Sequence, residues 1–359
     1  MRLLMLTRYG PLGASSRLRS LQYVPALRAA GIETDVSSLL GDDYVRDLYT
    51  GRIAPAAVAA AYLRRWRRLR DAGRYDLVWI EKEAWPWLPG WLERALLDRG
   101  TRLVFDYDDA LFHRYDTHRS RWVRAVLGSK IDGLMRRADL VTAGNDYLAA
   151  HARAAGCRHV ARLPTVVDLT RYPLPSPRAP DGRTVVVGWI GSPSTAGYLR
   201  AVAEPLASLQ AAGRIRCVAI GARPDQVEGT PFDAVPWHES TEADQLRQCD
   251  IGIMPLPDGP WERGKCGYKL IQYMACGLPV VASPVGINVE LVADGERGWL
   301  ADTDTQWSEA ISRLVADPSL RRRMGQAGRA LVEHHYSLQV QAGRLIELLR
   351  GAARAESVA

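Results

Sequence analysis

Short apolar runs alternate along the chain with longer stretches in which apolar residues return every three or four positions. The runs predict buried strands, and the longer stretches predict amphipathic helices. In the first half the predicted strands cover residues 3–7, 33–39, 76–80, 102–109, 139–144 and 159–164. After the first strand, Leu18, Leu21, Val24 and Leu27 predict one helix that ends at Gly31. This alternation predicts a mostly parallel, doubly wound sheet.

The same alternation restarts after residue 183. Predicted strands cover residues 184–191, 215–221, 233–237, 250–256, 279–283 and 298–302, and a helix is predicted from about Ser194. Residues 173–182, PLPSPRAPDG, hold four prolines and are typical of an interdomain linker. The sequence therefore predicts an α/β chain with Rossmann-like domains at 1–172 and 183–336 that face each other across a cleft. An amphipathic helix at 337–359 is expected to pack back toward the N-terminal domain.

Length and cysteine content narrow the class of protein. A chain of 359 residues suits two domains. No apolar run approaches the roughly 18 residues that span a bilayer. The apolar patch before Thr7 is too brief for a signal peptide, so it is interpreted as a strand. The five cysteines are odd in number and form no CxxC pair, which favours reduced thiols, a cytoplasmic location and no zinc site.

The formal net charge of +7 has two interpretations. One is a surface of solvated arginines, and the other is attraction to an anionic partner such as the inner face of a membrane. The predicted helix within 59–76 carries Trp66 among arginines and leaves both interpretations open. Nucleic acid is not expected as a partner, because the chain shows no recognised nucleic-acid module.

A basic turn interrupted by glycine runs directly into a predicted helix at 263–286, RGKCGYKLIQYMACGLPVVASPVG. Backbone N–H groups at a helix N-terminus, together with nearby cations, are a common way to bind phosphate. Arg263 and Lys265 lie in that turn. The stretch therefore predicts a phosphorylated ligand, although both residues could also be ordinary loop charges.

The segment 267–302, GYKLIQYMACGLPVVASPVGINVELVADGERGWLAD, resembles the GT-B glycosyltransferases, specifically the retaining family four. The resemblance extends over nearly the whole chain and implies a donor-binding second half and an acceptor-binding first half. Two family glutamates that contact the donor sugar and the ribose are replaced here by Gly264 and Gln272. The resemblance implies ribose binding by Gln272, with Glu262 as a substitute near the sugar. Gly267, with Tyr268 beside it, matches a glycine that lets backbone approach the donor.

The family also places an arginine and a lysine just after the first strand of the second half, where they hold the diphosphate. This chain instead has Gly191, Ser192 and Thr195 there, and no cation precedes Arg200. The resemblance therefore implies that the 191–195 loop binds the donor and that Arg263 and Lys265 replace the missing cations. Trp237 falls where the family's base-binding loop begins, but a core tryptophan is an equal alternative.

A carboxylate cluster, Asp106, Asp108 and Asp109, ends the predicted strand at 102–109, and His113 follows. It superficially matches the DxD metal site of GT-A transferases and the opening motif of aspartate-nucleophile phosphatases. Purely structural capping is a further alternative. In the GT-B resemblance, Asp108 and Asp109 take the place of a His-Asp pair. Asp108, Asp109 and His113 are then the catalytic candidates, with no metal and no cofactor expected.

The first loop supplies further candidates. The resemblance implies that Gly10 and Gly13 lie near the donor phosphates, and Ser15 and Arg17 near the acceptor. The preferred hypothesis is a cytoplasmic enzyme that moves a sugar from a nucleotide diphosphate sugar to a hydroxyl of a glycan or lipid-linked acceptor. Two alternatives stay open: a non-catalytic nucleotide- or glycan-binding protein, and a metal-dependent phosphoryl-transfer enzyme that uses Asp106–Asp109.

Overall fold

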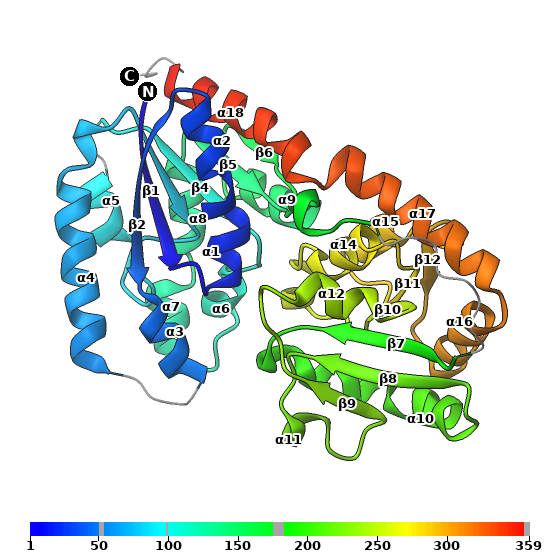
Figure 1. Cartoon of the computed structure of the whole chain (residues 1–359). Coiled ribbons are helices and arrows are strands. Elements are labelled where there is room, and N and C mark those ends of the chain that lie inside the picture. The colour runs from blue at the N-terminus through cyan, green and yellow to red at the C-terminus, as the bar shows by residue number, and fades with distance from the viewer. Residues whose placement is uncertain (50–53, 98–99, 175–182, 355–359) are drawn as a thin grey trace. The chain divides into compact units, whose positions relative to one another are not determined.

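A computed structural model describes residues 1–49, 54–97, 100–174 and 183–354 of the chain (Figure 1). The chain divides into two compact units. Unit 1 comprises Met1–Thr165, Gly264–Cys266 and Gln341–Ala359, and unit 2 comprises Val166–Arg263 and Gly267–Val340. Of the expected linker, all but Pro173 and Leu174 lies outside the described residues.

The boundaries of these units differ from the expected 172 and 336. Val167 pairs with Ser337 in an isolated parallel bridge. Tyr172 packs into a core cluster of unit 2. Residues 166–172 therefore belong with unit 2. The segment Gly264–Cys266 belongs with unit 1, although its neighbours in sequence do not.

Unit 1 is built on a six-stranded parallel sheet of order β2-β1-β3-β4-β5-β6. Its strands are β1 (Arg2–Tyr9), β2 (Glu33–Leu40), β3 (Leu77–Glu81), β4 (Leu103–Tyr107), β5 (Leu140–Ala143) and β6 (Val160–Arg162). Its helices are α1 (Ala14–Arg19), η1 (Leu21–Tyr23), α2 (Val24–Ala29), α3 (Asp42–Tyr49), α4 (Pro55–Arg70), η2 (Ala72–Arg74), α5 (Gly90–Leu97), α6 (Phe112–Asp116), α7 (Arg121–Leu127), α8 (Lys130–Arg137) and α9 (Asp146–Ala154). All six strands fall within the predicted runs or extend them by one or two residues.

Unit 2 holds a second six-stranded parallel sheet of order β12-β11-β10-β7-β8-β9. Its strands are β7 (Val185–Ile190), β8 (Ile215–Ile220), β9 (Phe232–Val235), β10 (Ile251–Met254), β11 (Val280–Ala282) and β12 (Gly298–Leu300). Its helices are η3 (Leu169–Arg171), η4 (Pro193–Val202), α10 (Ala203–Ala211), α11 (Pro224–Val227), α12 (Glu242–Arg247), α13 (Pro260–Arg263), α14 (Tyr268–Ala275), α15 (Asn288–Val292), α16 (Asp304–Ala316) and α17 (Pro318–His335). The helix α18 (Leu338–Arg354) begins in unit 2, and its residues from Gln341 onward belong to unit 1. There the Arg350 guanidinium donates a hydrogen bond to the carbonyl of Ala30 at 2.7 Å.

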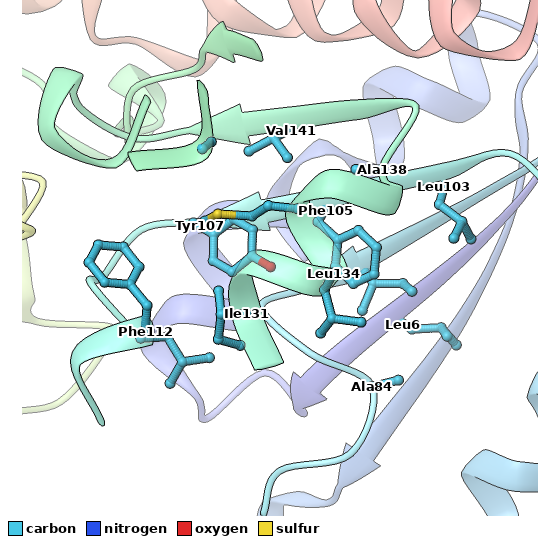
Figure 2. Close-up of a cluster of buried hydrophobic side chains, with 14 of the residues drawn as sticks. Leu6, Ala84, Leu103, Phe105, Tyr107, Phe112, Ile131, Leu134, Ala138 and Val141 are labelled. Atoms are coloured by element: carbon cyan, nitrogen blue, oxygen red, sulfur yellow. The ribbon is translucent and has the colours of Figure 1, made fainter. Parts of the chain in front are cut away.

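The central strands, such as β3, β7 and β10, are mostly apolar and buried because helices cover both faces of each sheet. In unit 2, Ile190 and Val280 pack into one core cluster, and Val187 and Trp189 pack into another on the opposite face. In unit 1, one cluster joins β1, β3, β4 and β5 to helices on the same face. Figure 2 shows part of this cluster, with Phe105 and Tyr107 of β4 beside Ile131 and Leu134 of α8. In each unit, packed cores therefore fix the positions of the strand ends.

The prediction of a single helix after β1 is wrong. The structure breaks it into α1, η1 and α2. Ser20 has φ −128° and ψ −63°, which are not helical values. Pro25 lies in the first turn of α2, where its missing N–H costs no hydrogen bond. The helix predicted from about Ser194 begins instead as the 3₁₀ helix η4 and continues as α10.

Candidate functional site

The strand order places a switch point in each sheet. In unit 1, β1 is flanked by β2 and β3, so the chain leaves the carboxyl ends of β1 and β3 toward opposite sides. In unit 2 the same reversal separates β7 and β10. Open α/β sheets bind their ligands at such points, beyond the carboxyl ends of the strands. Most of the predicted site residues follow these four strands or β4, which is next to β3.

In unit 1, Asp108 and Asp109 lie beside a lysine that the sequence analysis did not select. The ammonium of Lys82 lies 2.9 Å from Oδ1 of Asp108 and 3.2 Å from Oδ2 of Asp109. It also donates to the hydroxyl of Ser15 at 3.0 Å. Ser15 in turn donates to Oδ2 of Asp108. Ser15 and the two carboxylates thus form one cluster around Lys82.

Asp106 has a structural position within β4. Its carboxylate accepts two hydrogen bonds from the Arg19 guanidinium, at 2.5 and 2.9 Å, and one from Thr142 at 2.6 Å. Arg19 also donates to the carbonyl of Leu163 at 2.7 Å. The side chains of Asp106 and Arg19 are almost fully buried. This pair fixes α1 and its Ser15 against the ends of β4 and β5.

The segment Gly264–Cys266 completes the cluster. Nζ of Lys265 lies 2.8 Å from Oδ1 of Asp109, so Asp109 accepts from two lysines. Asn145 donates to the carbonyl of Lys265 at 2.8 Å. A Cβ at Gly264 would lie 2.5 Å from Cβ and 2.7 Å from N of Ala110. Side chains are therefore excluded at the position where the family has a glutamate.

The charges of the cluster keep Asp108 ionised. Burial alone would raise the pKa of Asp108, but Lys82, Arg19 and the hydroxyl of Ser15 lower that pKa below the ordinary aspartate value. Burial alone would lower the pKa of Lys82, and the carboxylates of Asp108, Asp109 and Glu81 raise that pKa above the ordinary lysine value. The cluster therefore presents a carboxylate and an ammonium throughout the neutral range.

His113 is not part of this cluster. Its Nε2 lies 2.7 Å from the hydroxyl of Tyr147, and its Nδ1 lies 3.1 Å from both carboxylate oxygens of Asp116. Among the described residues it makes no polar contact with Asp108 or Asp109. Its catalytic role stays a prediction without support from this geometry.

The loop after β1 packs tightly against its neighbours. A Cβ at Gly10 would lie 2.5 Å from the carboxylate of Asp42, and one at Gly13 would lie 2.4 Å from Cβ of Tyr9. The guanidinium of Arg17 donates to the carbonyl of Pro11 at 2.9 Å. Both glycines thus have a steric reason to be there, and the predicted ligand contacts of this loop stay predictions.

In unit 2, Gly191 follows β7 at the switch point and lies against Lys269. A Cβ at Gly191 would lie 2.7 Å from Cε of Lys269 and 2.4 Å from the Trp189 ring. Nζ of Lys269 lies 5.5 Å from the centre of that ring, within cation–π range. Lys269 is in the first turn of α14, where a cation opposes the helix dipole unless an anion is bound nearby. The structure therefore puts a cation where the sequence analysis found none.

The remaining loop residues of unit 2 surround this point. Gly221 follows β8, and a Cβ there would lie 2.2 Å from the carbonyl oxygen of Gly191 and 3.4 Å from Cβ of Trp237. The hydroxyl of Ser192 lies 2.8 Å from that of Ser194, and the Thr195 N–H donates to the Ser192 carbonyl at 3.0 Å. The structure therefore gathers the 191–195 loop, Trp237 and Lys269 at one end of the sheet.

Other predicted donor residues have protein partners. Gln272 is buried, and its amide donates to the hydroxyl of Tyr172 at 3.0 Å. Glu262 accepts from the hydroxyl of Tyr198 at 2.6 Å. The side chain of Arg263 is half exposed and lies 2.7 Å from Asp258.

Gly267 begins α14 with φ 65°, a left-handed conformation that favours glycine, and Tyr268 follows it. A Cβ at Gly267 would also lie 2.3 Å from Leu291. The donor contacts of Gln272, Glu262, Arg263 and these two residues stay predictions.

A single sequence signal could have found both missed lysines. The chain has 47 lysines and arginines, and only four of them are lysines: Lys82, Lys130, Lys265 and Lys269. Arginine takes the other 43 positions, and the rare lysines differ from it in carrying a compact ammonium in place of a planar guanidinium. Each of the four meets a carboxylate or, in the case of Lys269, an aromatic ring at the end of a sheet.

The described residues hold neither a candidate metal site nor a membrane-spanning helix. No group of three or more histidine, cysteine, aspartate and glutamate side chains there could hold a metal ion. None of the helices in the described ranges is both long and apolar enough to cross a membrane.

Comparison with known proteins places part of the chain in a family. Residues 184–317 match the family model of the glycosyl transferases group 1. The chain is 37% identical over 135 residues to the GDP-mannose-dependent α-(1-6)-phosphatidylinositol monomannoside mannosyltransferase of Mycolicibacterium smegmatis, covering 35% of this chain and 32% of that relative. It is 38% identical over 92 residues to the α-maltose-1-phosphate synthase of the same organism, covering 24% of that relative. The chain thus spans a third or less of the length of these curated relatives.

Solved structures match over almost the whole chain. Sucrose-phosphate synthase from Thermosynechococcus elongatus has a TM-score of 0.71 at 16% identity, covering 98% of both chains. Anabaena HepE in complex with UDP and glucose has a TM-score of 0.69 at 17% identity, covering 98% of this chain and 100% of that one. At such identities the likeness shows the fold. The chain has the GT-B fold, and its residues 184–317 belong to the glycosyl transferases group 1 family.

Proposed function

We propose that this protein is a glycosyltransferase that moves a sugar from a nucleotide diphosphate sugar to a hydroxyl of a glycan or lipid-linked acceptor. The observation that carries the proposal is the group 1 family match, which lies over the sheet of unit 2 and its switch point. One relative is named as GDP-mannose-dependent, and HepE was solved with UDP and glucose. In this proposal unit 2 binds the donor and unit 1 binds the acceptor.

Donor binding is supported by the end of the sheet in unit 2. The nucleoside diphosphate that leaves during transfer gains negative charge, and fixed cations and backbone amides stabilise that charge. Lys269, with the α14 N-terminus beside Gly191, offers both. Trp237 lies across the same end, next to Gly221, where a nucleobase could stack on its ring. Gln272, Arg263 and Lys265 stay in the proposal as further donor contacts.

The lowered pKa of Asp108 bears on the mechanism. A carboxylate with a pKa well below the working pH is a weak general base. Asp108 and Asp109 therefore suit hydrogen bonding to substrate hydroxyls better than proton abstraction. This favours retention of configuration, in which a donor phosphate oxygen accepts the proton of the attacking hydroxyl. The pairing of Asp106, Asp108 and Asp109 with Arg19, Lys82 and Lys265 also disfavours the metal-dependent phosphoryl-transfer alternative.

A cytoplasmic enzyme that contacts an anionic membrane is the remaining part of the proposal. The side chain of Trp122 in α7 is 81% exposed, and Arg119, Arg121 and Arg124 around it are exposed as well. In α4, Trp66 is also partly exposed. Exposed tryptophan beside arginine is typical of membrane-interface contacts.

The test of the proposed activity is transfer from labelled UDP-, GDP-, ADP- and dTDP-sugars to octyl glucoside and octyl mannoside, with and without EDTA. We expect a labelled glycoside product from at least one donor, undiminished by EDTA. NMR of the new anomeric proton gives the stereochemistry. Nucleotide-sugar binding without transfer or hydrolysis would favour a non-catalytic binding protein. Activity lost in EDTA and restored by Mn²⁺ would contradict the metal-free mechanism.

A further inference from the structure

Lys82 occupies an unusual backbone position at the switch point of unit 1. It directly follows β3 and has φ 62°, one of three positive φ values at non-glycine residues in the described part of the chain. The Glu83 N–H donates to the Glu81 carbonyl at 2.7 Å, which makes Lys82 the centre of a three-residue turn. Turns of this kind with positive φ are rare and strained, and strain persists where the surrounding structure enforces it.

Buried charges on both sides enforce this turn. On one side, Glu81 accepts from the hydroxyl of Ser16 at 2.6 Å and from the Arg8 N–H at 2.8 Å. On the other side, Glu83 lies 2.8 Å from Nζ of Lys130 and accepts from Tyr115 at 2.9 Å. The Lys82 N–H itself donates to the Asp106 carbonyl at 2.9 Å. The turn is therefore held from three directions.

The consequence of this turn is the direction of one ammonium group. Nζ of Lys82 lies within 3.2 Å of oxygen atoms on Asp108, Asp109 and Ser15. A compact ammonium can meet three convergent acceptors, whereas the planar fork of arginine cannot. Both carboxylates keep further lone pairs for other donors, because a carboxylate can accept about four hydrogen bonds. Their side chains are 13% and 22% exposed, so solvent reaches them.

We propose that Lys82 is a positioning residue, whose ammonium fixes Asp108 and Asp109 as ionised hydrogen-bond acceptors for hydroxyls of the acceptor substrate. This inference rests on the proposed function. The strained turn and its buried flanking charges exist to aim that ammonium. Lys82 itself makes no bond to the acceptor.

The electrostatic setting of the two aspartates determines the direction of the expected pH effect. The titratable and charged groups that face them come from α1, β3 and its turn, β4 and the 264–266 segment: Arg19, Glu81, Lys82, Asp106, Lys265 and Cys266. Lys82 contacts both carboxylates. Its removal raises the pKa of Asp108, so protonation, and loss of the acceptor role, begins at a higher pH.

The test compares Lys82→Met and Lys82→Arg with the wild type, with Arg46→Met as an exposed control. Transfer to octyl glucoside and octyl mannoside is measured against pH, and the binding of both glycosides is measured by calorimetry. We expect Lys82→Met to weaken glycoside binding and raise the acceptor KM by about tenfold or more, the scale of a lost charged hydrogen bond. The donor KM should not change, and the acid limb of kcat/KM should move to higher pH. Lys82→Arg should restore the acid limb but not the acceptor KM.

The outcomes separate this inference from the proposed function. An unchanged acceptor KM and an unchanged acid limb in a folded Lys82→Met variant would overturn the inference and leave the function intact. A lower stability with unchanged kinetics would show a merely structural role and would overturn it as well. A wild type that transfers no sugar contradicts the proposed function. In that case glycoside binding decides, and a wild type that binds neither glycoside overturns the inference.

Discussion

Lys130 and Glu83 form an ion pair of 2.8 Å in which neither side chain is exposed to solvent. The same ammonium lies 2.7 Å from Glu93 and donates to the carbonyl of Trp85 at 2.5 Å. Glu93 also accepts from the backbone N–H groups of Ala84 and Trp85. One lysine thus bridges two buried carboxylates and fixes the chain that follows β3.

Lys130→Met should destabilise unit 1 by about 3–5 kcal/mol, because it removes the buried ammonium that Glu83 and Glu93 share. The measurement is urea unfolding followed by a probe in unit 1. Arg46→Met is the matched control, since Arg46 and Asp43 form a pair with side chains 63% and 96% exposed. Exposed pairs of this kind contribute little. Equal unfolding midpoints for Lys130→Met and the control would contradict the importance of this network.

Gly264→Ala tests the fit of the 264–266 segment. Its Cβ would meet Ala110 at distances that require backbone atoms to shift. We expect a loss of about 1–3 kcal/mol, the usual range for overpacking. Gly197→Ala is the control, because a Cβ there meets no heavy atom within 4 Å. The two variants should differ in unfolding midpoint. A Gly264→Ala variant as stable as the control would show that the 264–266 segment can shift away from Ala110 without loss of stability.

The strands were predictable because buried parallel strands have a plain sequence pattern. Runs such as LVWI and VVVGWI have no other position to occupy than between two helical layers. The helices after β1 and β7 were less predictable. A leucine repeat continues through Ser20 and Pro25, and only the missing N–H of the proline indicates that a new helix must start there.

The candidate site was predictable in part. Asp108, Asp109 and Gly191 were found because polar or glycine residues directly after a buried strand stand out. Lys82 was missed because its contacts depend on a strained turn that no local pattern predicts. Lys269 was missed because its neighbour Gly191 is distant in sequence and comes close only through the order of the strands.

Asp108 gives a prediction for the pH dependence of stability. Its folded-state pKa is below the ordinary value, so its contribution is present above that ordinary value of about 4 and is lost as the pH falls toward the folded pKa. Asp108→Asn should therefore be less stable than the wild type near neutral pH, and the difference should shrink below about pH 4. Urea unfolding of both proteins across this range is the measurement. A difference that does not depend on pH would contradict the ion pair with Lys82.

Membrane contact is tested with vesicles of phosphatidylcholine with and without phosphatidylglycerol. The wild type should sediment with the anionic vesicles only, and Trp122→Ser and Trp66→Ser should each reduce the bound fraction, because tryptophan anchors at the interface. Val340→Ser, at a residue of unit 2 that is 45% exposed, should bind like the wild type. Equal binding to both kinds of vesicle, or no effect of either tryptophan substitution, would contradict membrane contact through Trp66 and Trp122.

Lys269→Met tests the cation at the end of the sheet in unit 2. Lys269 lies beside Gly191 in the first turn of α14, where its charge opposes the helix dipole and a bound anion would offset that cost. Arg263 already pairs with Asp258, and Lys265 pairs with Asp109. We therefore expect Lys269→Met to weaken binding of the preferred nucleoside diphosphate by about 1.5–3 kcal/mol, roughly 10- to 100-fold in Kd. Arg263→Met and Lys265→Met should have smaller effects.

Binding of the plain nucleoside should change little in any of the three variants, since it has no phosphate. Calorimetry with UDP, GDP, ADP and dTDP and with their nucleosides measures the Kd of the diphosphate and the Kd of the plain nucleoside for each variant. If Lys269→Met keeps wild-type affinity for the diphosphate while Arg263→Met or Lys265→Met loses it, the phosphate-binding cation lies in the 263–265 turn, as the sequence alone had indicated.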